Sequence, residues 1–215
     1  DLFDGVASIV DFDNLENLSI RLRRRIPPRV ETSDGAKERA ASLARWAMSR
    51  GFDVVDERRW DAVQRRCAAA VDHVVGLAGV DHGRVATCGH SAGGHLALWA
   101  AGRHRLPTGS SLAGPLVRPV AAVALAGVSD LVAGARERLG DGAVQALLEA
   151  EPDEVPERYA LASPAALVPL GARLLLVHGD RDEEVPPDQS ASFAAGAAAV
   201  GDEVELRAPD DVDHF

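Results

Sequence analysis

The sequence predicts an α/β fold in which helices cover both faces of a mostly parallel, doubly wound sheet. Strand-like apolar runs alternate with helix-like segments along the chain, as in parallel sheets built from β-α-β units. These runs are continuous rather than alternating, which is typical of strands buried on both faces. The length of 215 residues suits a single domain of this kind. We therefore treat residues 1–215 as one domain.

The first quarter of the chain predicts a helix and a short strand. Residues 1–35 are poorly defined, because charges interrupt short apolar stretches and Pro27-Pro28 would break a helix. Residues 36–50 predict a helix that stops before Gly51, with small apolar side chains at helical spacing: Ala40, Leu43, Ala44 and Ala47. The stretch FDVVD that follows predicts a strand.

The alternation continues to the end of the sequence. Helices are predicted over residues 61–77, 92–103 and 188–200, and strands over residues 84–88, 117–127, 172–179 and 202–209. Between the second and third of these strands, residues 128–170 contain several helix-like pieces, and we expect them to form a cap that covers a pocket. Reactive groups collect at the carboxyl ends of parallel strands, so the loops after strands are where a site is expected.

Composition restricts the function classes. There are 33 acidic and 23 basic residues, which gives a formal charge of −10 and argues against nucleic acid or an anionic membrane as a partner. No apolar run approaches the roughly 18 residues of a membrane span, and no signal peptide is visible. The two cysteines, Cys67 and Cys88, lack a metal-ligand spacing and are expected to be buried in a protein of the reducing cytoplasm. The oligomeric state is not readable from the sequence.

The pattern G-x-S-x-G occurs once, at Gly89-His90-Ser91-Ala92-Gly93, between a predicted strand and a predicted helix. In a nucleophile elbow the serine lies on a strained turn at this junction, where flanking side chains would collide with backbone. The helix amino terminus behind it favours developing negative charge. The alternative is a glycine-rich turn whose serine merely caps the helix. We predict Ser91 as a nucleophile, with His90 and Gly93 contacting the substrate.

A serine needs a base, and the base needs an acid that orients it. The stretch LLLVHGDRDEEVPP offers Asp180, Asp182, Glu183 and Glu184 after the strand at 172–179. His214 lies just beyond the last predicted strand, so the order serine, acid, histidine matches this class of hydrolase. Of the other histidines, His178 is expected to lie too close in sequence to Asp182 to be its partner, and His90 and His95 to pack the turn or line the pocket.

From about Gly51 to Phe215 the chain resembles the α/β-hydrolase superfamily. It is similar to the esterase branch that contains kynurenine-formamidase-like proteins, and also to prolyl-oligopeptidase-type hydrolases. The resemblance lies in GHSAGGHLALWA, LAGVSDL, ERYALASPAAL, LLLVHGDRDEEVP and DHF. It implies Ser91 as nucleophile, Asp182 rather than Asp180 as acid and His214 as base, with no cofactor and no metal. It also implies a structural role for Asp130 at the start of the cap.

The resemblance breaks at the oxyanion hole. One donor is implied at the backbone N–H of Ala92, but the family's His-Gly-Gly loop is absent, and Asp34-Gly35 is the only candidate for the second donor. We also expect the family's early strands and closing helix to be missing or divergent here. The prediction is a serine hydrolase, a carboxylesterase or an arylformamidase-like enzyme that cleaves a carboxylic ester or a small amide through an acyl-enzyme. The alternatives are a prolyl-oligopeptidase-like peptidase and a non-catalytic relative.

Overall fold

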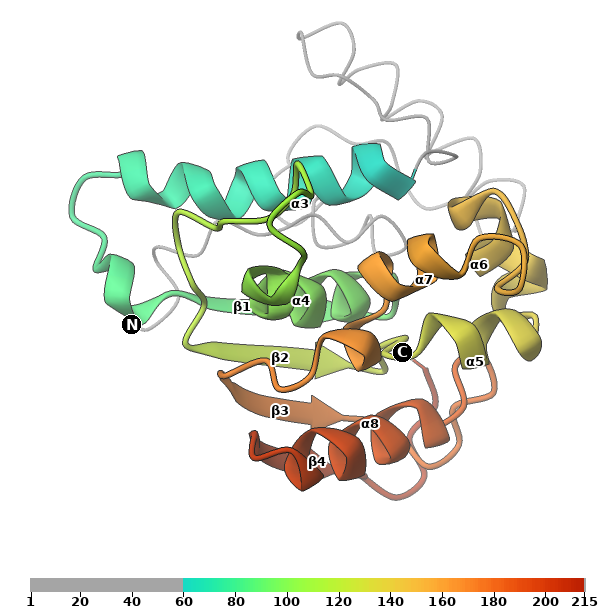
Figure 1. Ribbon diagram of the computed structural model, residues 1–215. Helices are drawn as coiled ribbons and strands as arrows, with labels where there is room; N and C mark the ends of the chain where they lie inside the picture. The colour runs from blue at the N-terminus through green and yellow to red at the C-terminus, as the bar shows by residue number, and fades with distance from the viewer. Residues whose placement is uncertain (1–59, 215) are drawn as a thin grey trace, which may run out of the picture.

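The computed structural model describes residues 60–214, which form a four-stranded parallel sheet and its helices (Figure 1). The strands are β1 (Ala86–His90), β2 (Ala121–Leu125), β3 (Arg173–Val177) and β4 (Glu203–Arg207), side by side in this order. All three pairings are parallel and in continuous register. The predicted helix over residues 36–50, the strand FDVVD and Gly35 lie outside the described residues.

The predicted helices over the described range are present. They are α3 (Trp60–His73), α4 (Ala92–Gly102) and α8 (Asp188–Ala199). Helix α3 ends four residues earlier than predicted and continues as a short 3-10 turn, η1 (Val74–Gly76). All four strands differ from their predicted limits, and β3 and β4 are only slightly shorter. Strand β1 begins two residues later and runs on to His90, and β2 begins at Ala121, after Pro119, which has no N–H for a ladder bond.

Helices α4 and α8 pack against the same face of the sheet (Figure 1). This face carries Ala122 and Ala124 from β2 and Leu174 and Leu176 from β3, all at most 2% exposed. They join one apolar cluster with α4 and with Phe193 of α8. The small alanines of β2 let α4 approach closely, which explains how a core with few aromatic side chains stays tightly filled.

Cys88 is exposed, and the prediction that it is buried was wrong. Successive side chains of a strand point to opposite faces. Thr87 points to α4, because its hydroxyl donates to the carbonyl of Ala97 at 2.8 Å, so Cys88 points to the other face. Cys67, on α3, is buried as predicted, and burial raises the pKa of its thiol to about 12, so it stays a neutral apolar group.

The predicted cap segment, residues 128–170, folds as α5 (Leu131–Arg136), α6 (Leu139–Leu148), α7 (Pro156–Ala162) and the 3-10 helix η4 (Pro164–Leu167). The three α-helices lie beyond the carboxyl ends of the strands (Figure 1). They enclose a second apolar cluster of their own, made of Leu131, Ala135, Val144, Leu148, Tyr159 and Ala162. The segment is therefore a small packed unit rather than a loop.

Two side chains of α4 attach this segment to the main core. His95 Nε2 donates to the carbonyl of Ala162 at 2.8 Å, and Trp99 Nε1 donates to the carbonyl of Leu161 at 2.9 Å. Both carbonyls lie in the last turn of α7, where a helix has no N–H donors of its own left to satisfy them. His95 is buried, and burial lowers its pKa, so the bond is made by the neutral imidazole.

The buried guanidinium of Arg103, just after α4, links α3 to the loop that follows α4. Arg103, 3% exposed, pairs with Asp72 of α3 and donates to the carbonyls of Ala68 and Leu112 at 3.1 and 2.8 Å. The second oxygen of Asp72 accepts from the N–H of Leu116. Both charges are thus paired and hydrogen-bonded, as buried charges must be.

Within residues 60–214, no helix is long and apolar enough to cross a membrane.

We expect Arg103→Met to lower the free energy of unfolding by about 3–5 kcal/mol, because it leaves Asp72 and two buried carbonyls without their donor. Urea unfolding followed by circular dichroism measures this. Arg105→Met is the matched control, since Arg105 is exposed on the same short turn, and it should change little. Equal, small losses in the two variants would contradict the role assigned to Arg103.

The low pKa of His95 makes stability fall in acid. The unfolded chain takes up a proton on His95 as the pH drops through 6.5, whereas the folded chain resists it, so unfolding is favoured below that pH and unaffected above it. His95→Gln keeps a donor for Ala162 but does not titrate. The free energy of unfolding, measured from pH 8 to pH 5, should therefore fall more steeply for the natural chain than for His95→Gln. Parallel curves would contradict this.

Candidate functional site

The serine after β1 lies on a strained turn. Ser91 has φ 53° and ψ −121°, a backbone conformation that side chains with a Cβ rarely adopt. It precedes the first residue of α4, yet its side chain makes no capping hydrogen bond with that helix. Its N–H donates to the carbonyl of Leu125 at the end of β2, at 2.8 Å. The hydroxyl is therefore not used as a helix cap, which was the alternative interpretation of this turn.

Two glycines make the turn possible. A Cβ on Gly89 would lie 2.1 Å from the carbonyl oxygen of Gly93, and one on Gly94 would lie 2.8 Å from Cα of Gly127. Real Cβ atoms essentially never come closer than 3.0 Å, so neither position accepts a side chain without a backbone shift. The second contact presses α4 against the residues after β2. Gly89 thus serves close backbone approach, as the sequence predicted, and Gly94, just outside the pattern, does the same.

A similar close approach joins the loops after β3 and β4. A Cβ on Gly179 would lie 2.2 Å from the carbonyl oxygen of Val212. The same carbonyl accepts from the N–H of Arg181 at 3.0 Å, and the N–H of Asp180 donates to Pro209. These backbone contacts align residues 179–182 with residues 209–214 and bring Asp182 to His214.

The carboxylate of Asp182 is buried, and both of its oxygens accept hydrogen bonds. Its Oδ2 accepts from Nδ1 of His214 at 2.7 Å, and its Oδ1 accepts from the N–H groups of Glu184 and Val185 at 3.0 and 2.8 Å. Burial raises the pKa of Asp182. The hydrogen bonds from His214 and the backbone, and the attraction of the carboxylate to the His214 and His178 rings, outweigh this effect, so the pKa lies below its ordinary value. Asp182 is ionised at neutral pH.

The neighbouring acids behave differently. Asp180, Glu183 and Glu184 are exposed, as expected for a solvated acidic turn. Among the four candidates in this loop, only Asp182 is hydrogen-bonded to a histidine ring in the described structure.

His90 connects His214 to the serine turn. Nε2 of His90 lies 2.6 Å from the carbonyl oxygen of His214, and because a carbonyl only accepts, this nitrogen carries the proton. The two rings lie 4.6 Å apart, centroid to centroid, at a tilt of 52°. Since His90 immediately precedes Ser91, the ring of His214 lies beside the turn that carries the serine. The prediction that His90 contacts substrate remains a prediction; its observed contact is with His214.

His178 lies closer to Asp182 than the sequence predicts. Its Nε2 is 3.0 Å from Asp182 Oδ2, but it donates to the carbonyl of Val185 at 2.9 Å, and the hydrogen bond to Asp182 comes from His214 as predicted. The turn after β3 folds back so that residues 178 and 182 face each other. The signal that could have found it is the spacing of four residues across a turn that contains Gly179.

The other residues predicted for the site are Ala92, Gly93 and Gly35, and Asp130 was predicted to have a structural role. Ala92 is the first residue of α4, where a helix has N–H groups without acceptors of its own, and Gly93 is buried behind it. Gly35 lies outside the described residues. Asp130 accepts from the N–H groups of Val132 and Ala133 and caps α5, which confirms its structural role at the start of the segment 128–170.

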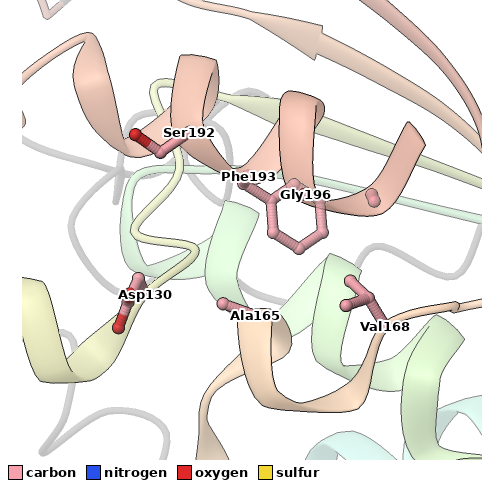
Figure 2. Close-up of a pocket in the computed structure, with 7 residues that line it drawn as sticks. Asp130, Ala165, Val168, Ser192, Phe193 and Gly196 are labelled. Carbon is pink, nitrogen blue, oxygen red and sulfur yellow. The ribbon is translucent and has the colours of Figure 1, made fainter. Parts of the chain in front are cut away.

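A small hollow of about 90 Å³ lies between α8 and the end of the segment 128–170. Figure 2 shows Phe193 of α8 facing Ala165 and Val168 across it. Its lining residues are Asp130, Ala165, Val168, Ser192, Phe193, Gly196 and Ala197. None of them is Ser91, Asp182 or His214, so the hollow is separate from the candidate site.

The family model BD-FAE matches residues 47–196, which is most of the chain. The chain belongs to the BD-FAE family. No curated protein matches the sequence significantly.

Solved structures agree with this assignment. The chain is similar to a truncated carbohydrate esterase from gut microbiota, with 22% identity and a TM-score of 0.62 over 76% of this chain and 65% of that one. An acetyl ester-xyloside bifunctional hydrolase from Caldicellulosiruptor lactoaceticus is 27% identical, with a TM-score of 0.53 over 71% of this chain and 55% of that one. A puromycin-hydrolyzing peptidase of Mycobacterium tuberculosis is 28% identical, with a TM-score of 0.57 over 74% of this chain and 23% of that one.

The BD-FAE match and these neighbours place the chain in the α/β-hydrolase superfamily, among esterases and peptidases, as its motifs predicted. The chain spans less than two thirds of the length of each of the three solved proteins.

We expect Ser91→Gly to raise the free energy of unfolding by about 1 kcal/mol, because glycine adopts the backbone conformation of residue 91 without strain. Ser91→Ala is the matched control: it removes the same hydroxyl but keeps the Cβ, and it should gain nothing. Urea unfolding compares the two. If glycine and alanine give the same stability, the turn is not strained.

Proposed function

We propose that this BD-FAE protein is a serine hydrolase that cleaves a carboxylic ester or a small amide through an acyl-enzyme. The observation that carries the proposal is the hydrogen bond between Asp182 and His214, made beside a serine that is held in a strained turn and is not used as a helix cap. No purely structural reason requires this combination, and it costs both strain and a buried charge.

In the proposed mechanism, Ser91 Oγ attacks the carbonyl carbon of the substrate. Nδ1 of His214 is occupied by Asp182, so Nε2 is the nitrogen that takes the serine proton and later returns it to the leaving group. Asp182 holds the ring in this tautomer and stabilises the imidazolium that forms. Water then attacks the acyl-enzyme, with His214 again acting as base.

The developing oxyanion would be met by the N–H of Ala92 at the amino end of α4. The second donor stays the prediction made for Gly35. We further propose that the segment 128–170 covers the site as a cap. Its helices lie beyond the carboxyl ends of the strands (Figure 1), where the loops that carry Ser91, Asp182 and His214 also begin.

Ester hydrolysis is the preferred reaction because two of the neighbours are named for it. Those two are named as a carbohydrate esterase and an acetyl ester-xyloside bifunctional hydrolase, so acetyl esters, including those of carbohydrates, are the first substrates to test. The peptidase neighbour makes peptide p-nitroanilides the second class, and aryl formamides the third.

A fluorophosphonate probe tests the nucleophile. We expect stoichiometric labelling that Ser91→Ala abolishes, because only a serine with a functioning base attacks phosphorus rapidly. Labelling of a folded sample at another residue, or none at all, would contradict the proposal and favour a non-catalytic relative.

The acid is tested by turnover of p-nitrophenyl acetate. Asp182→Asn should leave the fold intact and lower kcat by about 10⁴-fold, because an amide holds the wrong tautomer of His214. Asp180→Asn is the matched control, since Asp180 is exposed two residues away, and it should retain near-normal turnover. The opposite ranking would move the acid to Asp180.

A further inference from the structure

The loop that carries His214 has no helix or strand to hold it. Residues 208–214 have no regular structure and residues 210–213 are exposed, whereas His214 is 7% exposed. A side chain that is buried at the end of an exposed loop needs contacts that fix its backbone as well as its ring. Such contacts come from two sides.

The first side is the acid loop. Nδ1 of His214 donates to Asp182 at 2.7 Å. The carbonyl of Val212, two residues earlier, accepts from the N–H of Arg181 at 3.0 Å. These bonds fix the imidazole relative to its carboxylate. They do not fix it relative to the serine, because the serine follows β1 and His214 follows β4, the two outer strands of the described sheet.

The second side is the serine turn. His90 is the last residue of β1 and immediately precedes Ser91. Its Nε2 lies 2.6 Å from the carbonyl oxygen of His214, and since a carbonyl only accepts, the proton is on Nε2. The two imidazole rings also lie 4.6 Å apart, centroid to centroid. A side chain of the serine turn thus contacts both the backbone and the ring of the proposed base.

The main-chain bond constrains what the bond to Asp182 does not. A ring held at one nitrogen can still swing about that hydrogen bond if its Cα is free to move with the loop. Fixing the carbonyl of His214 fixes the rigid peptide plane beside its Cα. The ring of His90 also occupies part of the space into which the imidazole could turn. Together, the bonds to Asp182 and His90 set the direction in which Nε2 of His214 points.

We propose that His90 is a positioning residue that holds His214 against the serine turn. The kinetic consequence rests on the proposed function, whereas the positioning itself is a property of the folded chain. Because His90 and Ser91 are adjacent, the nucleophile and the anchor of its base are fixed to the same turn. This role differs from the substrate contact that the sequence predicts for His90, and the two roles have different kinetic signatures.

The test separates the hydrogen bond of His90 from its ring. His90→Gln keeps a donor, because the amide nitrogen of glutamine lies as many bonds from Cβ as Nε2 of histidine does. His90→Asn is one bond shorter and does not reach the carbonyl of His214, and His90→Phe keeps a ring but has no donor. Cys88→Ala is the matched control, since Cys88 is exposed on the same strand and points to the same face.

Circular dichroism and urea unfolding first establish that each variant is folded. The asparagine variant, whose side chain is smaller than histidine, keeps the test available should His90→Phe fail to fold.

The first readout is turnover of p-nitrophenyl acetate. We expect kcat to fall about 100-fold in His90→Asn and His90→Phe with KM near its natural value, because a displaced base weakens the transition state and not substrate binding. His90→Gln should recover most of kcat, and Cys88→Ala should lose nothing. A raised KM with kcat kept in the asparagine and phenylalanine variants would assign His90 to substrate contact and overturn the inference. So would turnover that no variant of His90 changes, which leaves the proposed function intact.

The second readout is independent of activity. The proton that Nδ1 of His214 donates to Asp182 should give a far-downfield NMR signal, assigned by its loss in His214→Asn. We expect this signal to persist in the natural chain, Cys88→Ala and His90→Gln. It should broaden or vanish in His90→Asn and His90→Phe, because a ring that moves exposes the proton to exchange with water.

This pattern supports the positioning even if no substrate is turned over, in which case only the proposed function fails. A signal that persists in every variant of His90, that is lost equally in the glutamine and asparagine variants, or that is absent from the natural chain overturns the inference.

Discussion

A single buried carboxylate determines how this edge of the sheet is arranged. Asp182 has lost its water and must find hydrogen bonds for every lone pair that carries charge. The turn after β3 supplies two backbone N–H groups, with the ring of His178 3.0 Å away, and the loop after β4 supplies His214. Two segments far apart in sequence are thus fixed to one ion. Removing either would leave the charge partly unpaired, so the arrangement depends on both.

Close backbone contacts at glycines hold the loops around this carboxylate in place. Gly179 brings the acid loop against Val212, and Gly89 and Gly94 bring the serine turn against α4 and Gly127. In each case a loop reaches its position because one residue lacks a Cβ, and the neighbouring strands hold it there by their parallel register. The strain at Ser91 is stable only because the residues around it are fixed in this way.

The sequence predicted the features that follow from the order of residues along the chain. It missed the contacts that arise where a turn reverses the direction of the chain. The sequence itself shows the continuous apolar runs of the strands and the serine between glycines. It also shows an acid and a histidine after later strands. The contact of His178 with Asp182 arises from the path of a turn, which no periodicity describes. Cys88 was misplaced because composition suggests burial, whereas its face of the strand is set by Thr87 and α4.

The limits of the helices in the segment 128–170 were beyond prediction for a related reason. Arg138, Gly140, Asp141 and Gly142 all adopt positive φ, which interrupts α6 where the sequence reads as helical. Left-handed residues of this kind are selected by the packing around them rather than by local preference.

The same segment is attached to both halves of the candidate site. His95 and Trp99 bind the end of α7 to α4, the helix that begins at the serine turn. At its other end, the buried amide of Gln189 on α8 accepts from the N–H groups of Ser129 and Asp130, just after the acid loop. A displacement of residues 128–170 would therefore also displace α4, which begins after Ser91, and α8, which follows the loop that carries Asp182. If it covers the site as proposed, substrate entry and the alignment of the reacting groups are mechanically linked, because the same buried hydrogen bonds carry both.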